Sequence, residues 1–261
     1  MFDVTPLSPV VRPIVLAASE IVYKQTEPWL LALLIHGSAY KGGAIPGCSD
    51  IDLQVYLERT AFDIYGALRL DVAAAIQRKL STIDTGPFQY IQTYAFPPAP
   101  LPLARREHWV GPIPGTYHLL YGTLPIAEAT EAEVVFRCHN TMEHIPTAIC
   151  DASRNLLAHG SGKLKRAARL ICCEVWPVYY SVLSLRNEEP FASWKLPKEE
   201  AIALIEPYES LGKEIRTFYK LVYEYFGQEH TTEDALAVVL QGVRFLRVAE
   251  RWYRRNARKS Q

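Results

Sequence analysis

A strand, a glycine-rich connection and a second strand make up the segment that most constrains this chain. Residues 30–36 are a continuous apolar run closed by a glycine, a pattern typical of a strand buried on both faces. Residues 37–49 contain four glycines and a proline, which predicts a connection. Residues 50–57 then alternate in polarity, which predicts another strand. The segment therefore predicts two neighbouring strands with a tight turn between them.

Two aspartates stand at the start of the second expected strand. Asp50 and Asp52 are two positions apart, so both carboxylates leave the same face of a strand and repel each other. Mg²⁺ relieves such repulsion, because it takes carboxylate and phosphate oxygens together. Gly37 and Ser38, at the end of the first strand, offer backbone amides and a hydroxyl to phosphate oxygens. The pattern predicts a metal and triphosphate site; the alternative is a turn with two solvent-facing aspartates.

Residues 36–57, HGSAYKGGAIPGCSDIDLQVYL, resemble the signature of the DNA polymerase β superfamily of nucleotidyltransferases. They are most similar to the streptomycin and spectinomycin type of aminoglycoside adenylyltransferase, which also places Gly-Gly and a proline between Gly-Ser and Ser-Asp-Ile-Asp-Leu. Weaker similarities are found at residues 120–122 and 166–198. The resemblance implies an α+β fold. Residues 1–129 would form the nucleotidyltransferase domain, a mixed β-sheet with helices, and residues 130–261 a C-terminal antiparallel helical bundle.

The resemblance also implies an activity. Such a protein transfers AMP from ATP, with Mg²⁺, to a hydroxyl of an acceptor, which in this family is a small molecule such as an aminoglycoside. Asp50 and Asp52 would be the catalytic metal ligands. The expected nucleotide-binding residues are Gly37, Ser38, Lys41 and Ser49. Lys41 has the alternative interpretation of a solvated loop lysine.

The third strand departs from the pattern of the family. Polymerase β relatives place a third carboxylate there, as a metal ligand or as the base that accepts the hydroxyl proton. By its place on the strand the third catalytic position here is Gln89, with Gln92 the next polar candidate. An amide cannot accept that proton, and general base catalysis is typically worth about 10²–10⁴-fold in rate. The alternative function is therefore a degenerate nucleotide-binding or regulatory protein. Other carboxylates considered for the base are Asp84, Glu107 and Glu174.

The remaining periodicities outline the two expected domains. Helices are predicted at 7–27 and 61–80, a third strand at 88–96 and an irregular, proline-rich segment at 97–116. Long helical stretches follow a boundary near Thr130, at residues 131–158, 162–186, 197–226 and 231–256. An aminoglycoside needs several carboxylates for its ammonium groups. The candidates in the chain are Glu107, Glu128, Glu131, Glu143 and Glu174.

A second motif suggests another function. Arg154 and His159 fit the Arg-polar-x-x-x-His pattern of HEPN domains, some of which are ribonucleases that partner minimal nucleotidyltransferases. On that interpretation the protein belongs to a toxin–antitoxin type system and acts on RNA or protein. The alternative is a helix end with His159 near its C-terminal dipole.

Composition limits the remaining choices. Lys plus Arg equals Asp plus Glu at 28 each, so the overall charge does not indicate a surface that binds nucleic acid. The basic segment 244–259 is expected to be an amphipathic last helix, and the alternative is an RNA-binding tail. Five cysteines without a CxxC pair fit neither a disulfide framework nor a zinc site.

Without an expected signal peptide or membrane span, we expect a cytoplasmic monomer or homodimer whose partners are a nucleoside triphosphate and an acceptor.

Overall fold

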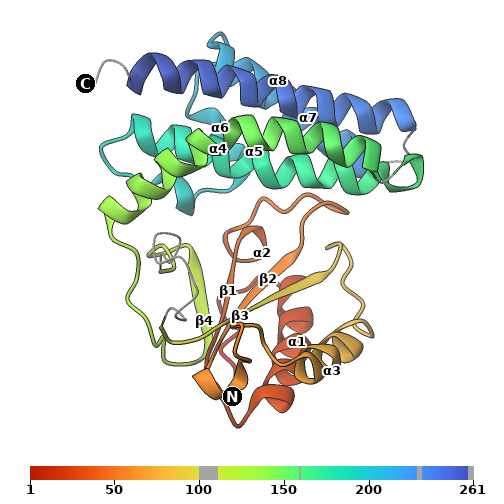
Figure 1. The fold of residues 1–261 in the computed structure, drawn as a ribbon, viewed down its shortest axis with the longest axis vertical. Coiled ribbons are helices and arrows are strands. Elements are labelled where there is room, and N and C mark those ends of the chain that lie inside the picture. Colours follow the sequence, from red (N-terminus) through yellow and green to blue (C-terminus); the bar gives the residue numbers. More distant parts are fainter. Residues whose placement is uncertain (100–110, 159, 228–230, 258–261) are drawn as a thin grey trace. The chain divides into compact units, whose positions relative to one another are not determined.

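The computed structural model describes residues 1–99, 111–158, 160–227 and 231–257. By its internal contacts the chain divides into two compact units, Met1–Thr130 and Glu131–Gln261. Unit 1 contains a four-stranded sheet with helices, and unit 2 is helical (Figure 1). None of the described helices is long and apolar enough to cross a membrane.

The sheet of unit 1 is mixed. Its strands are β1 (Leu30–His36), β2 (Ile51–Leu57), β3 (Ile91–Phe96) and β4 (Tyr117–Gly122), in the spatial order β3-β2-β1-β4. β1 is antiparallel to both β2 and β4, whereas β2 and β3 are parallel. The predicted strands are confirmed in type, although β3 begins three residues later than expected, and β4 was not predicted.

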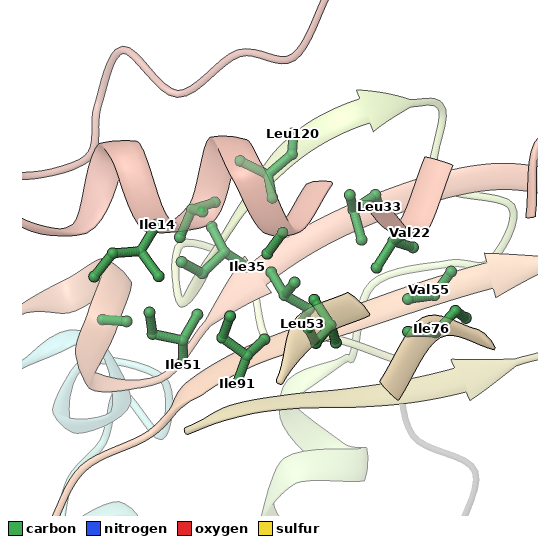
Figure 2. Close-up of a cluster of buried hydrophobic side chains, with 14 of the residues drawn as sticks. Ile14, Val22, Leu33, Ile35, Ile51, Leu53, Val55, Ile76, Ile91 and Leu120 are labelled. Atoms are coloured by element: carbon green, nitrogen blue, oxygen red, sulfur yellow. The ribbon is translucent and has the colours of Figure 1, made fainter. Parts of the chain in front are cut away.

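One face of the sheet carries the core of unit 1. The helices α1 (Val11–Thr26) and α3 (Leu70–Leu80) pack on this face, and the alternate residues of β1 and β2 point toward them. Ile51, Leu53 and Leu57 are fully buried there. Figure 2 shows these side chains meeting those of the helices, such as Val22 and Ile76.

One expected helix of unit 1 is wrong in extent. The predicted helix at 61–80 exists only as α3, because a 3₁₀ turn at Arg59–Ala61 and a small β-bridge between Phe62 and Leu68 precede it. Asp63 stabilises this hairpin, since its carboxylate accepts the backbone N–H groups of Tyr65 and Ala67. Most of the expected irregular segment lies outside the described residues.

Unit 2 is built from long helices packed side by side (Figure 1). Its helices are α4 (Glu131–Ala158), α5 (Leu164–Arg186), α6 (Lys198–Ala203), α7 (Ser210–Gly227) and α8 (Thr232–Ala257), with 3₁₀ turns at Ser161–Lys163 and Ser193–Lys195. The short connection between α4 and α5 makes them antiparallel neighbours. The single helix predicted at 197–226 is wrong: it is broken into α6 and α7 around Pro207, because proline disfavours a helical residue before it.

The last helix is packed as the sequence predicts. α8 contacts α4, α5 and α7. Phe245, Leu246 and Ala249 are fully buried, whereas Arg244 and Arg247 are exposed. The described part of the basic segment therefore belongs to an amphipathic helix.

Candidate functional site

The two aspartates lie on the face of the sheet opposite α1 and α3. Asp50 immediately precedes β2 and Asp52 is its second residue. The residues that alternate with them, Ile51 and Leu53, are fully buried in the core. Because successive side chains of a strand point to opposite faces, both carboxylates leave the other face, where each is half-buried.

Gly37 lies directly against one of these carboxylates. His36, the last residue of β1, pairs with Asp52, and Gly37 follows it. A β-carbon added to Gly37 would lie 2.6 Å from Oδ2 of Asp52. Only a glycine allows the backbone at the end of β1 to come this close to Asp52.

A single helical turn, α2 (Ser38–Lys41), follows the glycine. The turn is held by two backbone hydrogen bonds, in which the N–H groups of Tyr40 and Lys41 donate to the carbonyl of Gly37 at 3.2 and 3.0 Å. Ser38 begins this turn and Lys41 ends it, and both side chains are half-buried. Their expected contacts with a nucleotide stay predictions.

Ser49 has a structural task in the loop before Asp50. Its side-chain oxygen accepts the backbone N–H of Ile45 at 2.9 Å, and its own N–H donates to the carbonyl of Ile45 at 2.9 Å. The residue is 8% exposed. Ser49 therefore fixes the turn that leads into Asp50, and a nucleotide contact from it stays a prediction.

Gln89, expected to be the catalytic polar residue of the third strand, lies outside β3, and its role stays a prediction. Gln89 lies two residues before β3, with its N–H bonded to the carbonyl of Ser49 at 2.8 Å, and its buried Oε1 has no hydrogen-bond partner among the described residues. Instead, Gln92 pairs with Asp52 across the parallel ladder. Register partners project to the same face, so the side chains of Gln92 and Asp52 leave the sheet on the same side. Gln92 is the residue beside the aspartates.

The structure brings together neighbours that sequence reasoning missed. His36 Nε2 lies 3.2 Å from Nε2 of Gln54, and Oε1 of Gln54 accepts the hydroxyl of Tyr56 at 3.2 Å. Burial raises the pKa of Tyr56 to about 12, so the hydroxyl keeps its proton and acts as the donor. The sequence signal was the alternation along residues 50–57, which places Gln54 and Tyr56 on the same face as the two aspartates.

The other carboxylates considered from the sequence are dispersed. Asp84 accepts the N–H of Gly86 in an exposed turn, and Glu128 accepts the hydroxyl of Tyr117 at 2.8 Å. Burial and Glu128 together raise the pKa of Tyr117 to about 12. Glu107 lies outside the described residues, and unit 2 contributes Glu131, Glu143 and Glu174.

The donor set around Asp52 fits a metal that is shared with a nucleotide. Among the residues that the structure describes, no three His, Cys, Asp or Glu side chains converge on one point, so the chain does not form a complete metal cage. Mg²⁺ is usually held by one or two carboxylates together with substrate phosphates and water. Asp50 and Asp52 meet that requirement, and the backbone of Gly37, which carries no side chain, lies against Oδ2 of Asp52.

The mixed four-stranded sheet with its helices and the helical second unit together form a fold that is also found in a solved adenyltransferase structure. The structure is similar to that of spectinomycin adenyltransferase AAD(9) from Enterococcus faecialis, solved with ATP and spectinomycin. The TM-score is 0.50 at 13% sequence identity, over 89% of this chain and 98% of that chain. No family model and no curated protein sequence matches the chain. The resemblance expected from the sequence is therefore confirmed at the level of the fold.

The HEPN-like segment is only partly described. Arg154 is on α4 and forms an exposed ion pair with Asp151 at 2.8 Å, one turn earlier. His159 lies outside the described residues. This pairing accounts for Arg154 as part of an ordinary helix surface.

Proposed function

We propose that this protein is a Mg²⁺-dependent nucleotidyltransferase that transfers AMP from ATP to a hydroxyl of an acceptor molecule. The observation that carries the proposal is the close approach of Gly37 to Asp52, at the junction of β1 and β2. This approach places an amide-bearing turn beside two carboxylates on one face of a sheet. The similarity to a structure solved with ATP and spectinomycin supports it.

In this proposal the residues of the chain bind and orient the nucleotide. The backbone at Gly37 comes close to the phosphates because no side chain intervenes, and the hydroxyl of Ser38 donates a hydrogen bond to a terminal phosphate. Lys41 adds positive charge at the end of the same turn. Mg²⁺, held by Asp50 and Asp52, would neutralise charge on the α-phosphate and on the departing pyrophosphate. The acceptor hydroxyl is aligned with the bond that breaks. Because both reactants are held in place, the reaction between them becomes effectively unimolecular.

A thermal unfolding experiment tests the nucleotide site. Mg²⁺ with ATP at a hundredfold excess over the dissociation constant stabilises a protein by about 2.7 kcal/mol, which is measured as a rise in Tm of several degrees. Asp50→Asn and Asp52→Asn are expected to remove this rise, because each loses a charged metal ligand. Asp71→Asn is the matched control: Asp71 is on α3, 65% exposed, and paired only with a surface arginine at 2.7 Å. An unchanged rise in both site variants would rule out the assigned site.

A second candidate function is favoured by Gln92. Because the position beside Asp52 is an amide, the protein could bind a nucleotide in a regulatory role without turning it over. This candidate predicts a rise in Tm with Mg²⁺ and ATP but no pyrophosphate release with any acceptor. Pyrophosphate released above the level of the Asp52→Asn variant would reject it.

A further inference from the structure

The polar side chains beside Asp52 form one row across the sheet. Gln92 of β3 pairs with Asp52, Asp52 pairs with His36 of β1, and His36 pairs with Tyr117 of β4. Residues in register project to the same face, and neighbouring strands are about 4.8 Å apart. The row therefore shows which groups can reach an acceptor oxygen beside the metal ligands.

Gln92 occupies the place in this row where a third carboxylate would act as the base. A side-chain amide has two N–H donors and a carbonyl acceptor, and it takes up no proton at neutral pH. Gln92 can therefore orient an acceptor, but it cannot remove a proton from one.

One ring nitrogen of His36 accepts a hydrogen bond from a neighbour on β2. Gln54 uses Oε1 to accept the hydroxyl of Tyr56, which leaves its amide Nε2 facing Nε2 of His36 at 3.2 Å. An amide N–H donates, so Nε2 of His36 accepts this hydrogen bond. The lone pair on Nε2 of His36 is thus occupied by the hydrogen bond from Gln54.

The carboxylates in the row or bonded to it already have other roles or partners. Asp52 is assigned to the metal together with Asp50. Glu128 is bound to Tyr117 at the far end of the row, two strands away from Asp52. As far as the described strands define it, the row presents an acceptor with neutral donors and no further negative charge.

We propose, building on the function proposed above, that the acceptor hydroxyl is one already ionised at neutral pH, the P–OH of a phosphate monoester, and that Gln92 is the specificity-determining residue that admits it. The second pKa of such a phosphate is about 6, so at pH 7 its oxygen is a nucleophile without help from a base. A carboxylate in place of Gln92 would repel the phosphate, whereas an amide N–H can donate to it. Polycationic acceptors need several carboxylates, which this row lacks.

The bonds formed and broken in this transfer balance without a base from the protein. One ionised oxygen of the acceptor phosphate bonds to the α-phosphorus of ATP. The bond from that phosphorus to the oxygen bridging the α- and β-phosphates breaks, and its electron pair leaves with pyrophosphate. The products are pyrophosphate and an adenylylated phosphate, linked as an anhydride, and no proton has to be taken from the acceptor.

The first test uses the acceptors of a cell extract. A small-molecule extract is divided, and one half is treated with immobilised alkaline phosphatase, which is filtered off. Both halves then receive the protein, Mg²⁺ and ATP labelled at the α-phosphate. We expect a labelled adenylylated product in the untreated half and its loss in the treated half. A product that survives the treatment overturns the inference and leaves the nucleotidyltransferase function intact. No product in either half, with the Mg²⁺ and ATP rise in Tm retained, also overturns it; a missing rise contradicts the proposed nucleotide site itself.

The second test changes the charge at Gln92. Gln92→Glu is expected to raise the KM for the phosphate acceptor at least about tenfold, because like charges in one site cost more than about 1.4 kcal/mol, while a rise in Tm with Mg²⁺ and ATP shows that the variant still binds the nucleotide. Gln77→Glu, at an exposed position of α3, is the isosteric control. Equal acceptor KM values in Gln92→Glu and the wild type, with both proteins folded, would contradict the assigned role of Gln92.

Discussion

The backbone of Gly37 and the carboxylate of Asp52 are so close that no side chain fits between them. A β-carbon at Gly37 would come within 2.6 Å of Oδ2 of Asp52, and the glycine has φ 73° and ψ −159°, a region that is essentially restricted to glycine. The conformation at the end of β1 and the position of Asp52 on β2 therefore depend on each other.

The variant Gly37→Ala tests this relationship. We expect a loss of about 1–3 kcal/mol in the free energy of unfolding from backbone strain, and loss of the rise in Tm with Mg²⁺ and ATP, because the methyl group displaces Asp52. Denaturant unfolding and thermal shift measure the two effects. The control Gly162→Ala adds a methyl group with nothing within 4 Å. If Gly37→Ala kept the full thermal shift, the close approach would have no role in nucleotide binding.

In unit 2 one serine ties a helix to the connection that follows it. The side-chain oxygen of Ser184 donates to the carbonyl of Pro190 at 2.8 Å and accepts the indole N–H of Trp194 at 2.7 Å, and the residue is 1% exposed. Ser184→Ala removes both bonds from a buried position and is expected to lower the free energy of unfolding by about 1–3 kcal/mol. Urea denaturation measures it. Ser161→Ala, at an exposed serine, should leave stability within about 0.5 kcal/mol.

At Gly242 two effects of an alanine oppose each other. Alanine favours a helix over glycine by about 1 kcal/mol, but a β-carbon on α8 would collide with Cγ1 of Ile171 and come within 3.1 Å of Cε2 of Phe218. Both neighbours are buried, so overpacking at a cost of about 1–3 kcal/mol should win, and Gly242→Ala should be destabilising. Gly227→Ala, which meets nothing within 4 Å, is the control. Equal stability of the two variants would mean that α5 and α7 adjust without cost.

A carboxylate on α5 should make stability depend on pH. Burial raises the pKa of Glu174, with His144 opposing and Asp151 adding to the shift. The folded state therefore holds this proton more tightly than the unfolded state, so stability is lost as pH rises from the ordinary carboxyl pKa through the raised one. Glu174→Gln should be more stable than the wild type at pH 7.5, and the difference should shrink at pH 4. Urea unfolding at both values measures it, with exposed Glu188→Gln as control; a difference independent of pH would assign the effect to packing.

The sequence predicted the centre of unit 1 well, because there local pattern and tertiary role agree. The apolar run of β1 and the alternation of β2 each reflect burial, and the glycines between them reflect the turn, so Asp50 and Asp52 could be placed on one face. The identity of their neighbour could not. Choosing between Gln89 and Gln92 requires the register of β2 against β3, and register is a property of the pairing rather than of either strand.

Other elements escaped prediction for local reasons. β4 has only one fully buried residue, Leu120, so its sequence lacks a clear alternation. The segment before α3 has the composition of a helix, yet Asp63 stabilises a hairpin there by bonds to backbone N–H groups that a helix would use. His36 was overlooked because its significance comes from Gln54 and Asp52, which are distant in the chain.

The pairing of β2 with strands on both sides has a consequence for how the site can be observed. A slip of β2 by one residue would turn Asp52 into the core and Leu53 toward the open face, so the proposed metal site exists only in the register that also buries Ile51 and Leu53. Binding of Mg²⁺ and ATP at this site would therefore show that β2 is in its native register. In a refolding experiment this binding is expected to appear only when β2 has paired with β1 and β3, which would make the nucleotide a probe for the native register of these three strands.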